Sequence, residues 1–359
     1  MSKIRVAIVG CGVVSHSYIP QLLKSKHVEL VAVCDNQVER AKKHAEDYHL
    51  PHYFGDVEQL LEEVDFELLV NLTSMNLHGP INKLALEKGR NVWCEKPIAT
   101  DLSTAYELLE VAKKKGVGIW GAPFTLLSPA YQKMAALISS GELGKATTAH
   151  GIYGWEGPSW GKWFYKNGGG ALFDLGVYNV TTLTGLLGPV KSVVAMAGAA
   201  IPERVVDGEL TTVEADDNTA IILDHGDAVF SVIQTGFTYK NQLDDWTIQV
   251  IGTEGTVAME GYDWEPRGVR VFTSKSGEWD TVAKDQEGYH WAGGATYIAE
   301  CLAEGKEPAI YGEHAVHVLE IMIASLKSAE TGRRIAIEST FPWSKERNAY
   351  ATDSVSGRG

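Results

Sequence analysis

The first 121 residues alternate between short apolar runs and amphipathic, charged stretches. The apolar runs predict buried strands, and the stretches between them have the apolar spacing of helices. Short connections between such elements are typical of a parallel sheet with helices on both faces. We therefore expect a doubly wound α/β domain over residues 1–123, with strands at residues 3–9, 30–35, 52–54, 66–72, 91–94 and 116–120 and helices at 37–48, 57–63, from 81, and 104–114.

The pattern changes beyond Phe124. A helix at 130–139 precedes longer strand candidates separated by turn signals, as in antiparallel hairpins. We expect an α+β domain over residues 124–345, built on a large, mostly antiparallel open sheet and closed by helices at 292–304 and 313–331. The small, polar residues 346–359 are expected to form a flexible tail. The predicted strands of this domain are 145–153, 191–199, 218–224, 227–235, 246–251, 255–260 and 268–273.

Composition limits the classes of partner. The chain has 359 residues, enough for two cores, and 45% of them are apolar. A net charge of −14 argues against nucleic-acid or anionic-membrane partners, which attract basic surfaces. No signal-peptide pattern and no apolar run of transmembrane length stand out, so we expect a cytoplasmic protein. The four cysteines lack metal-like spacing and are expected to be buried thiols: Cys11, Cys34, Cys94 and Cys301.

A glycine turn, Gly10-Cys11-Gly12-Val13-Val14-Ser15, follows the first strand and precedes the first helix. A strand that turns through Gly-x-Gly into a helix directs backbone N–H groups and the positive end of the helix dipole toward an anion. Gly10 permits the tight turn, Gly12 permits close approach of a pyrophosphate, and Val13 and Val14 complete the predicted binding turn. Ser15 replaces the usual third glycine with another small residue.

Asp35 ends the second strand. A carboxylate at this position accepts hydrogen bonds from adenosine ribose hydroxyls and repels a 2′-phosphate. No arginine directly follows it, so NAD is favoured over NADP. The alternative is a doubly wound domain that binds no nucleotide.

Glu95-Lys96-Pro97 follows the fifth strand. Ligands of open parallel sheets bind beyond the carboxyl ends of the strands, so Lys96 is expected beside the cofactor. Pro97 restricts the backbone and would hold the direction of the lysine. The alternative is an ordinary surface lysine.

These motifs, together with Thr73–His78, resemble the Gfo/Idh/MocA family of NAD(P)-dependent oxidoreductases, and Gly168–Asn179 is similar to its second-domain signature. The resemblance spans nearly the whole chain. It implies a Rossmann domain, a carbohydrate or polyol substrate, and a homo-oligomer, dimer or tetramer, formed through the second-domain sheet. It also implies that the cofactor is contacted by Thr73, Asn76, His78, Glu95, Lys96 and Trp163.

Asp174 and Tyr178 are spaced i, i+4 in a helix expected to start after the signature glycines. Such spacing places both side chains on one helix face. Gly176 within the helix suggests that something approaches its backbone, and by resemblance this is the nicotinamide with the substrate. By resemblance, Lys96 reaches the same point.

Many members carry histidine where Tyr178 stands, and tyrosine is found in the glucose–fructose oxidoreductase and dihydrodiol dehydrogenase branches. A phenol with a pKa of about 10 needs roughly 4 kcal/mol of stabilisation to act as a base at pH 7. An ammonium about 4 Å away supplies about that much. We therefore predict Tyr178 as the proton-transfer residue, Lys96 as its electrostatic partner, and Asp174 as the group that orients lysine or substrate.

Aromatic side chains crowd the segment before the signature. Their apolar faces and polar edges suit a sugar, although they suit a core equally well. We select Tyr153, Trp155 and Trp163 as substrate-binding candidates, along with the three catalytic candidates. A group around Glu313, His314 and His317 lacks a ligand set for a metal, so we expect a satisfied helix surface and no metal.

The favoured function is an NAD-dependent dehydrogenase. It would transfer hydride between nicotinamide and a secondary alcohol or ketone of a sugar, a sugar derivative or a cyclic polyol. One alternative is an NAD-dependent glycosidase or lyase that oxidises a glycoside transiently, with no net redox change. Another is a non-catalytic NAD-binding sensor.

Overall fold

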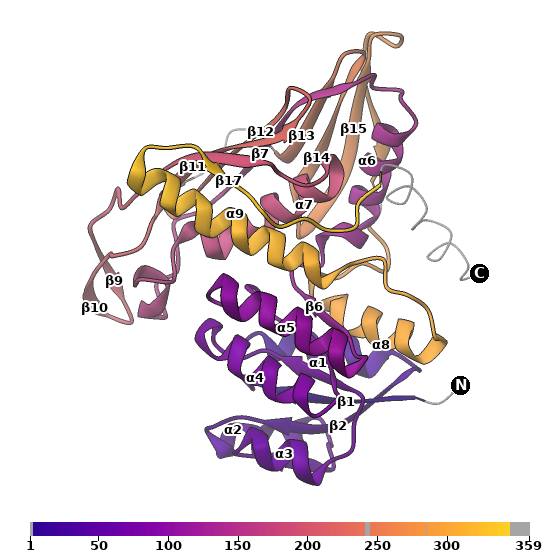
Figure 1. Cartoon of the computed structure of the whole chain (residues 1–359), viewed down its shortest axis with the longest axis vertical. Coiled ribbons are helices and arrows are strands. Elements are labelled where there is room, and N and C mark those ends of the chain that lie inside the picture. The colour runs from indigo at the N-terminus through magenta and orange to yellow at the C-terminus, as the bar shows by residue number, and fades with distance from the viewer. Residues whose placement is uncertain (1–2, 241–244, 285, 345–359) are drawn as a thin grey trace. The chain divides into compact units, whose positions relative to one another are not determined.

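The computed structural model describes residues 3–240, 245–284 and 286–344, which form two compact units (Figure 1). The first unit comprises the chain as far as Phe124 together with His290–Leu319. The second comprises Thr125–Tyr289 and the chain from Glu320 onward. The tail predicted at 346–359 lies outside the described residues.

The first unit contains a six-stranded parallel sheet with the order β3-β2-β1-β4-β5-β6. The order reverses between β1 and β4, which places a topological switch point at their carboxyl ends. This confirms the predicted doubly wound Rossmann sheet. Its strands are β1 (Ile4–Val9), β2 (Val28–Cys34), β3 (His52–Phe54), β4 (Leu68–Asn71), β5 (Asn91–Cys94) and β6 (Ile119–Gly121).

Among the described residues, six α-helices belong wholly to the first unit, and one of them comes from far along the chain: α1 (Ser15–Lys24), α2 (Val38–Asp47), α3 (Val57–Glu63), α4 (Met75–Glu87), α5 (Leu102–Lys115) and α8 (Gly294–Glu304). The sequence predicts α8 in the second domain, whereas the structure packs it on α1, β1 and β5. Gly294 makes this possible, because a Cβ there would lie 2.1 Å from the indole of Trp93 on β5. Ala295 and Ile298 complete the buried face.

The second unit contains a nine-stranded sheet with the order β16-β15-β14-β13-β7-β12-β11-β8-β17. Among its described pairs, β7–β12 is parallel and the others are antiparallel, which confirms the mostly antiparallel prediction. Its strands are β7 (Ala146–Gly154), β8 (Ser192–Gly198), β11 (Asn218–Gly226), β12 (Val229–Gly236), β13 (Trp246–Gly252), β14 (Gly255–Tyr262), β15 (Glu265–Thr273), β16 (Trp279–Ala283) and β17 (Ile335–Ala336).

Helices α6 (Pro129–Ser139) and α7 (Val177–Leu187) pack together on one face of this sheet (Figure 1). Helix α9 (Gly312–Thr331) begins in the first unit and ends in the second. A hairpin of β9 (Glu203–Val206) and β10 (Glu209–Thr212) forms a separate small sheet that was not predicted. In the described part of the chain, no helix has both the length and the apolarity to cross a membrane. All four cysteines are buried and free.

Candidate functional site

The glycine turn between β1 and α1 is held against the neighbouring strand ends. Gly10 has φ of +102°, and a Cβ there would lie 2.6 Å from the backbone carbonyl of Leu72, which follows β4. Its N–H donates to the carbonyl of Cys34 at the end of β2, at 2.8 Å. Only glycine fits this position. Because the turn contacts the ends of both β2 and β4, it lies at the sheet's switch point, as the motif predicts.

The outer side of the turn is open. A Cβ on Gly12 would have no neighbour within 4 Å, and Val13 beside it is 85% exposed. The buried Ser15 hydroxyl donates to the Gly12 carbonyl at 2.6 Å and lies 2.9 Å from Nε2 of His44. The space above Gly12, at the start of α1, fits a dinucleotide pyrophosphate.

Asp35 is fixed beside this turn by backbone donors. Its Oδ2 accepts from the N–H of Cys11 at 2.9 Å, and its Oδ1 accepts from the N–H of Gln37 at 2.8 Å. Each carboxylate oxygen retains a lone pair, so both can still accept from ribose hydroxyls. The acceptor set therefore fits the ribose of NAD.

His78 on α4 connects the two loops that carry the next candidates. Its Nδ1 lies 2.6 Å from the carbonyl of Pro97, and its Nε2 lies 2.9 Å from that of Thr73. Burial lowers the pKa of His78, so the neutral ring donates to only one of them at a time. At the start of α4, Asn76 accepts from the Ser74 hydroxyl at 2.7 Å. Cofactor contact by Thr73, Asn76 and His78 stays a prediction.

Lys96 follows β5 in a loop that α1 helps to orient. The Tyr18 hydroxyl donates to Oε1 of Glu95 at 2.8 Å, while the N–H of Lys96 donates to Oε2 at 3.0 Å. The indole of Trp93 in turn donates to the Tyr18 hydroxyl at 3.2 Å. Glu95 therefore orients the backbone that carries the half-buried Lys96, at the carboxyl end of the sheet.

In the second unit, the signature glycines lead into a helix capped by Asp216. Its Oδ2 accepts from the N–H of Leu172 at 2.9 Å and from the Thr219 hydroxyl at 2.8 Å. Gly170 has φ of +100°, and a Cβ there would lie 2.1 Å from Oδ1 of Asp216. Asp216 was not predicted; its sequence signal is a pair of acids, Asp216-Asp217, directly preceding a strand.

Asp174 and Tyr178 share a distinctive exposure. Between residues 171 and 186, these two are half-buried and all the remaining residues are buried. The predicted α-helical spacing is wrong in detail, because Leu172–Gly176 forms a π-helical turn before α7 begins at Val177. Its wider hydrogen-bonding pattern leaves the two side chains less than one turn apart. Such π turns occur frequently at functional sites.

The reason for a glycine at position 176 also differs from the expected one. A Cβ there would lie 2.8 Å from the Leu172 side chain and 3.1 Å from that of Thr235 on β12. Within this unit, the missing side chain lets the helix pack on the sheet. The packing explains the glycine without the nicotinamide that the resemblance suggested.

Aromatic rings surround Tyr178. The Tyr153 ring meets it edge-on with centroids 6.0 Å apart, and the Trp264 ring lies at 6.4 Å. Trp264 stacks on Tyr262 with the planes 8° apart. Trp264 and Tyr262 were not predicted from the sequence, although two aromatic residues on either side of Asp263, at a hairpin turn, mark them.

The other two aromatic candidates make different ring contacts. Trp155 lies 5.8 Å from Trp160, and Trp163 stacks on Phe164 with centroids 3.7 Å apart. Half of Trp163 is exposed, so it remains available to a ligand. Substrate or cofactor contact by these residues stays a prediction.

The histidines of α9 do not form the expected helix surface. His314 and His317 are buried, and burial with the neighbouring His317 lowers the pKa of His314 to about 3. Among the described residues, no group of three metal-ligating side chains is found. A neutral imidazole tolerates such burial far better than a charged one does.

Comparison with known proteins identifies the family. A model described as "Oxidoreductase family, NAD-binding Rossmann fold" matches residues 4–121, and the GFO/IDH/MocA C-terminal domain matches residues 131–258. The chain belongs to the GFO/IDH/MocA oxidoreductase family. Membership confirms the predicted resemblance, the NAD-binding Rossmann domain and an enzyme of the dehydrogenase class.

Relatives of this oxidoreductase resemble it along most of their length. Trans-1,2-dihydrobenzene-1,2-diol dehydrogenase of Macaca fascicularis is 27% identical, covering 95% of this chain and 99% of the relative. The scyllo-inositol 2-dehydrogenase (NAD(+)) of Bacillus subtilis is 25% identical, covering 94% and 97%. Aldose-aldose oxidoreductase from Caulobacter crescentus shares the fold, with a TM-score of 0.81 at 21% identity over 93% and 100%.

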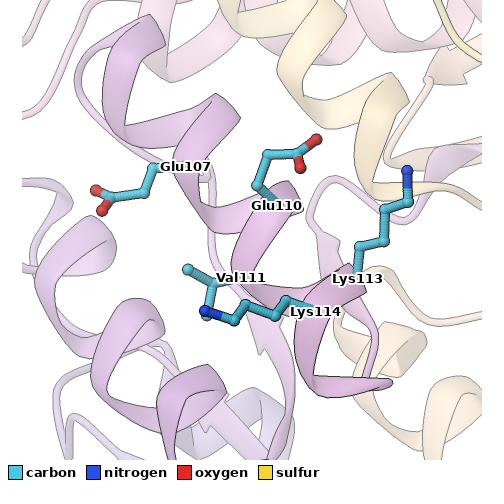
Figure 2. Close-up of a pocket in the computed structure, with 5 residues that line it drawn as sticks. All are labelled: Glu107, Glu110, Val111, Lys113 and Lys114. Atoms are coloured by element: carbon cyan, nitrogen blue, oxygen red, sulfur yellow. The ribbon is translucent and has the colours of Figure 1, made fainter.

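The oxidoreductase also has a surface hollow of about 430 Å³ on α5, apart from the predicted residues (Figure 2). It is lined by four charged residues and one valine of α5: Glu107, Glu110, Val111, Lys113 and Lys114. Glu107 pairs with Lys83 of α4 at 2.6 Å. None of the predicted site residues belongs to this hollow, and its mixed charges fit a solvated helix surface.

Proposed function

We propose that this oxidoreductase transfers hydride between NAD and a secondary alcohol or ketone of a sugar, a sugar derivative or a cyclic polyol. The observation that carries the proposal is the pair Asp174 and Tyr178, which alone stay accessible along an otherwise buried helix segment. A phenol beside a carboxylate, walled by aromatic rings, suits proton exchange with a hydroxyl of a ring-shaped substrate. The diol and inositol dehydrogenases among its relatives support this substrate class.

In the proposed reaction, the Gly10–Gly12 turn and Asp35 hold the dinucleotide. Bound NAD supplies the hydride acceptor or donor. Tyr178 takes the hydroxyl proton during oxidation and returns it during reduction. Lys96 acts on the same substrate, and its positive charge favours the phenolate form of Tyr178.

Asp174 has the complementary role in this proposal. Its carboxylate orients the lysine or accepts a hydrogen bond from a substrate hydroxyl. Tyr153, Trp155 and Trp163 offer ring faces to the C–H face of the substrate. The phenol must ionise for oxidation, so we expect a more alkaline optimum for oxidation than for reduction.

Turnover with NAD across a panel of free sugars, polyols and glycosides tests the function. Net NADH formation with a free sugar or polyol supports the dehydrogenase. Release of an aglycone without NADH accumulation would instead identify the redox-neutral glycosidase or lyase. Tight NAD binding without turnover on any member of the panel would identify a sensor.

We also propose that the open face of the nine-stranded sheet joins copies of the chain. Val194 on β8 and Ile222 on β11 are cross-strand partners, and both are exposed together with Met196 and Phe230. A continuous apolar face of this kind is typical of an interface. Light scattering should give a dimer or tetramer, and Met196→Lys should shift it toward monomer; a monomeric wild type would refute the proposal.

The four free, buried cysteines suit the predicted cytoplasmic location.

A further inference from the structure

The turn between β14 and β15 carries one fully buried carboxylate, although hairpin turns ordinarily lie at the surface. Tyr262 pairs with Glu265, so Asp263 and Trp264 form a two-residue turn. Asp263 has 0% exposure. A carboxylate with no access to water must be bound by donors, because burying it otherwise costs several kcal/mol.

The side-chain donors to Asp263 come from α7. Its Oδ2 accepts from Nδ2 of Asn179 at 3.0 Å and from the hydroxyl of Thr182 at 2.9 Å. The Thr182 hydroxyl also lies 3.0 Å from that of Thr125. The other oxygen, Oδ1, has no hydrogen-bond partner within the described ranges. The carboxylate therefore anchors the first two turns of α7. Backbone N–H groups of Asp263 and Trp264 also favour its charged form, but burial outweighs all of these donors and raises its pKa.

Asp263 and Tyr178 are linked on two sides. Asn179, which binds Asp263, is the chain neighbour of Tyr178, and Trp264, the chain neighbour of Asp263, contacts the Tyr178 ring at 6.4 Å. Tyr289 supplies a third link: burial raises its pKa, and the charges of Asp263 and Tyr178 both raise it further. Among the described residues, the other titratable neighbours named for Tyr178 are Asp174, less than one turn earlier in the same helical segment, Tyr153 on β7 and Tyr262 on the hairpin. Asp174→Asn therefore serves as a further background in the titration described below, because its carboxylate also opposes ionisation of the phenol.

We propose that Asp263 is a positioning residue for Tyr178: it anchors the turn of α7 that carries the phenol and places a buried negative charge beside it. This inference rests on the proposed function of Tyr178. A nearby negative charge opposes ionisation of a phenol, so Asp263 counteracts Lys96. Ionised Asp263 would keep Tyr178 protonated, and able to donate to a ketone, until the pH is well above neutral.

The substitution Asp263→Asn separates the charge from the anchor. Its amide oxygen can still accept from Asn179 and Thr182, so the geometry is retained while the charge is lost. Tyrosinate absorbance is titrated against pH in wild type and in Asp263→Asn, each with and without Tyr178→Phe. The difference within each pair isolates the titration midpoint of Tyr178 itself. We expect Asp263→Asn to lower that midpoint by about one pH unit. Asp280→Asn, which removes an exposed carboxylate from the edge strand β16, should leave it unchanged.

The anchor is tested separately by Thr182→Val, which keeps the side-chain volume and removes one donor. We expect a lower kcat, an unchanged KM and an unchanged Tyr178 midpoint. An unshifted midpoint in Asp263→Asn, or a wild-type kcat in Thr182→Val, would overturn the inference. Failure of the proposed function has a different signature, since Tyr178→Phe would then turn over normally whatever the titrations show.

Discussion

The ring of Tyr153 meets the ring of Tyr178 edge-on, with centroids 6.0 Å apart and planes at 74°. This contact joins β7, a central strand of the second sheet, to the first turn of α7. Edge-to-face pairs fix ring orientation and contribute about 0.5–1.5 kcal/mol beyond buried area. Tyr153 therefore limits the orientations of the Tyr178 ring, which the proposed proton transfer requires.

The two turn glycines should respond differently to alanine. Gly10→Ala brings a Cβ against the backbone of Leu72 at positive φ, so we expect a loss of about 1–3 kcal/mol in stability together with NAD affinity. Gly12→Ala meets open space, so it should fold normally and lose only NAD affinity. Thermal unfolding and calorimetric titration with NAD measure both quantities. Full NAD affinity in Gly12→Ala would place the pyrophosphate elsewhere.

A buried ion pair holds the segment that carries the aromatic candidates. Nη2 of Arg204 donates to Asp217 at 3.1 Å and to the carbonyl of Phe237 at 2.7 Å, and its guanidinium lies over the Tyr165 ring. The side chain of Arg204 is 12% exposed and that of Asp217 is 0% exposed. Arg204→Met should cost about 3–5 kcal/mol, because it leaves a buried charge uncompensated.

A matched control for that variant is Arg267→Met, since Arg267 pairs with Asp245 at the surface. An exposed pair contributes less than about 1 kcal/mol. Urea unfolding measures the loss of stability in both variants. Equal losses in the two variants would show that burial of the Arg204 pair has no special weight.

Asp263 should make stability fall as pH rises. Burial raises its pKa from the ordinary 3.8 to about 6, so the folded state favours the protonated form. Its stabilising contribution is complete below about pH 4 and is lost as pH rises toward about 6, for a total of about 3 kcal/mol. Asp263→Asn should remove this dependence and be the more stable protein at pH 8. Parallel stability curves for wild type and variant between pH 4 and pH 8 would contradict the assignment.

Elements with strong local signals were predicted from the sequence closely. The bounds of β3, β5 and α3 match the predicted ranges, because apolar runs and turn residues delimit them. The start of α4 at Met75 was missed, since Gly79 and Pro80 interrupt the helical pattern that follows it. The short strands β16 and β17 carry too few residues for a period to show.

Features set by tertiary packing could not be predicted. The apolar face of α8 marks a buried helix but does not say which sheet it covers; the fit of Gly294 to Trp93 decides that. The π turn before α7 shifts hydrogen bonds without changing the apolar spacing. Asp263 occupies a turn, and turn residues are ordinarily assigned to the surface. Its role depends on donors more than eighty positions earlier, which no local pattern connects to it.

The central claim is that the Tyr178 hydroxyl transfers the proton during hydride exchange, and Tyr178→Phe tests it most directly. The substitution removes one oxygen and keeps the ring that packs on Tyr153 and Trp264. We predict a turnover about 100- to 10,000-fold below wild type, with an unchanged Kd for NAD. A turnover within a few-fold of wild type, on the substrate that the panel identifies, would contradict the account.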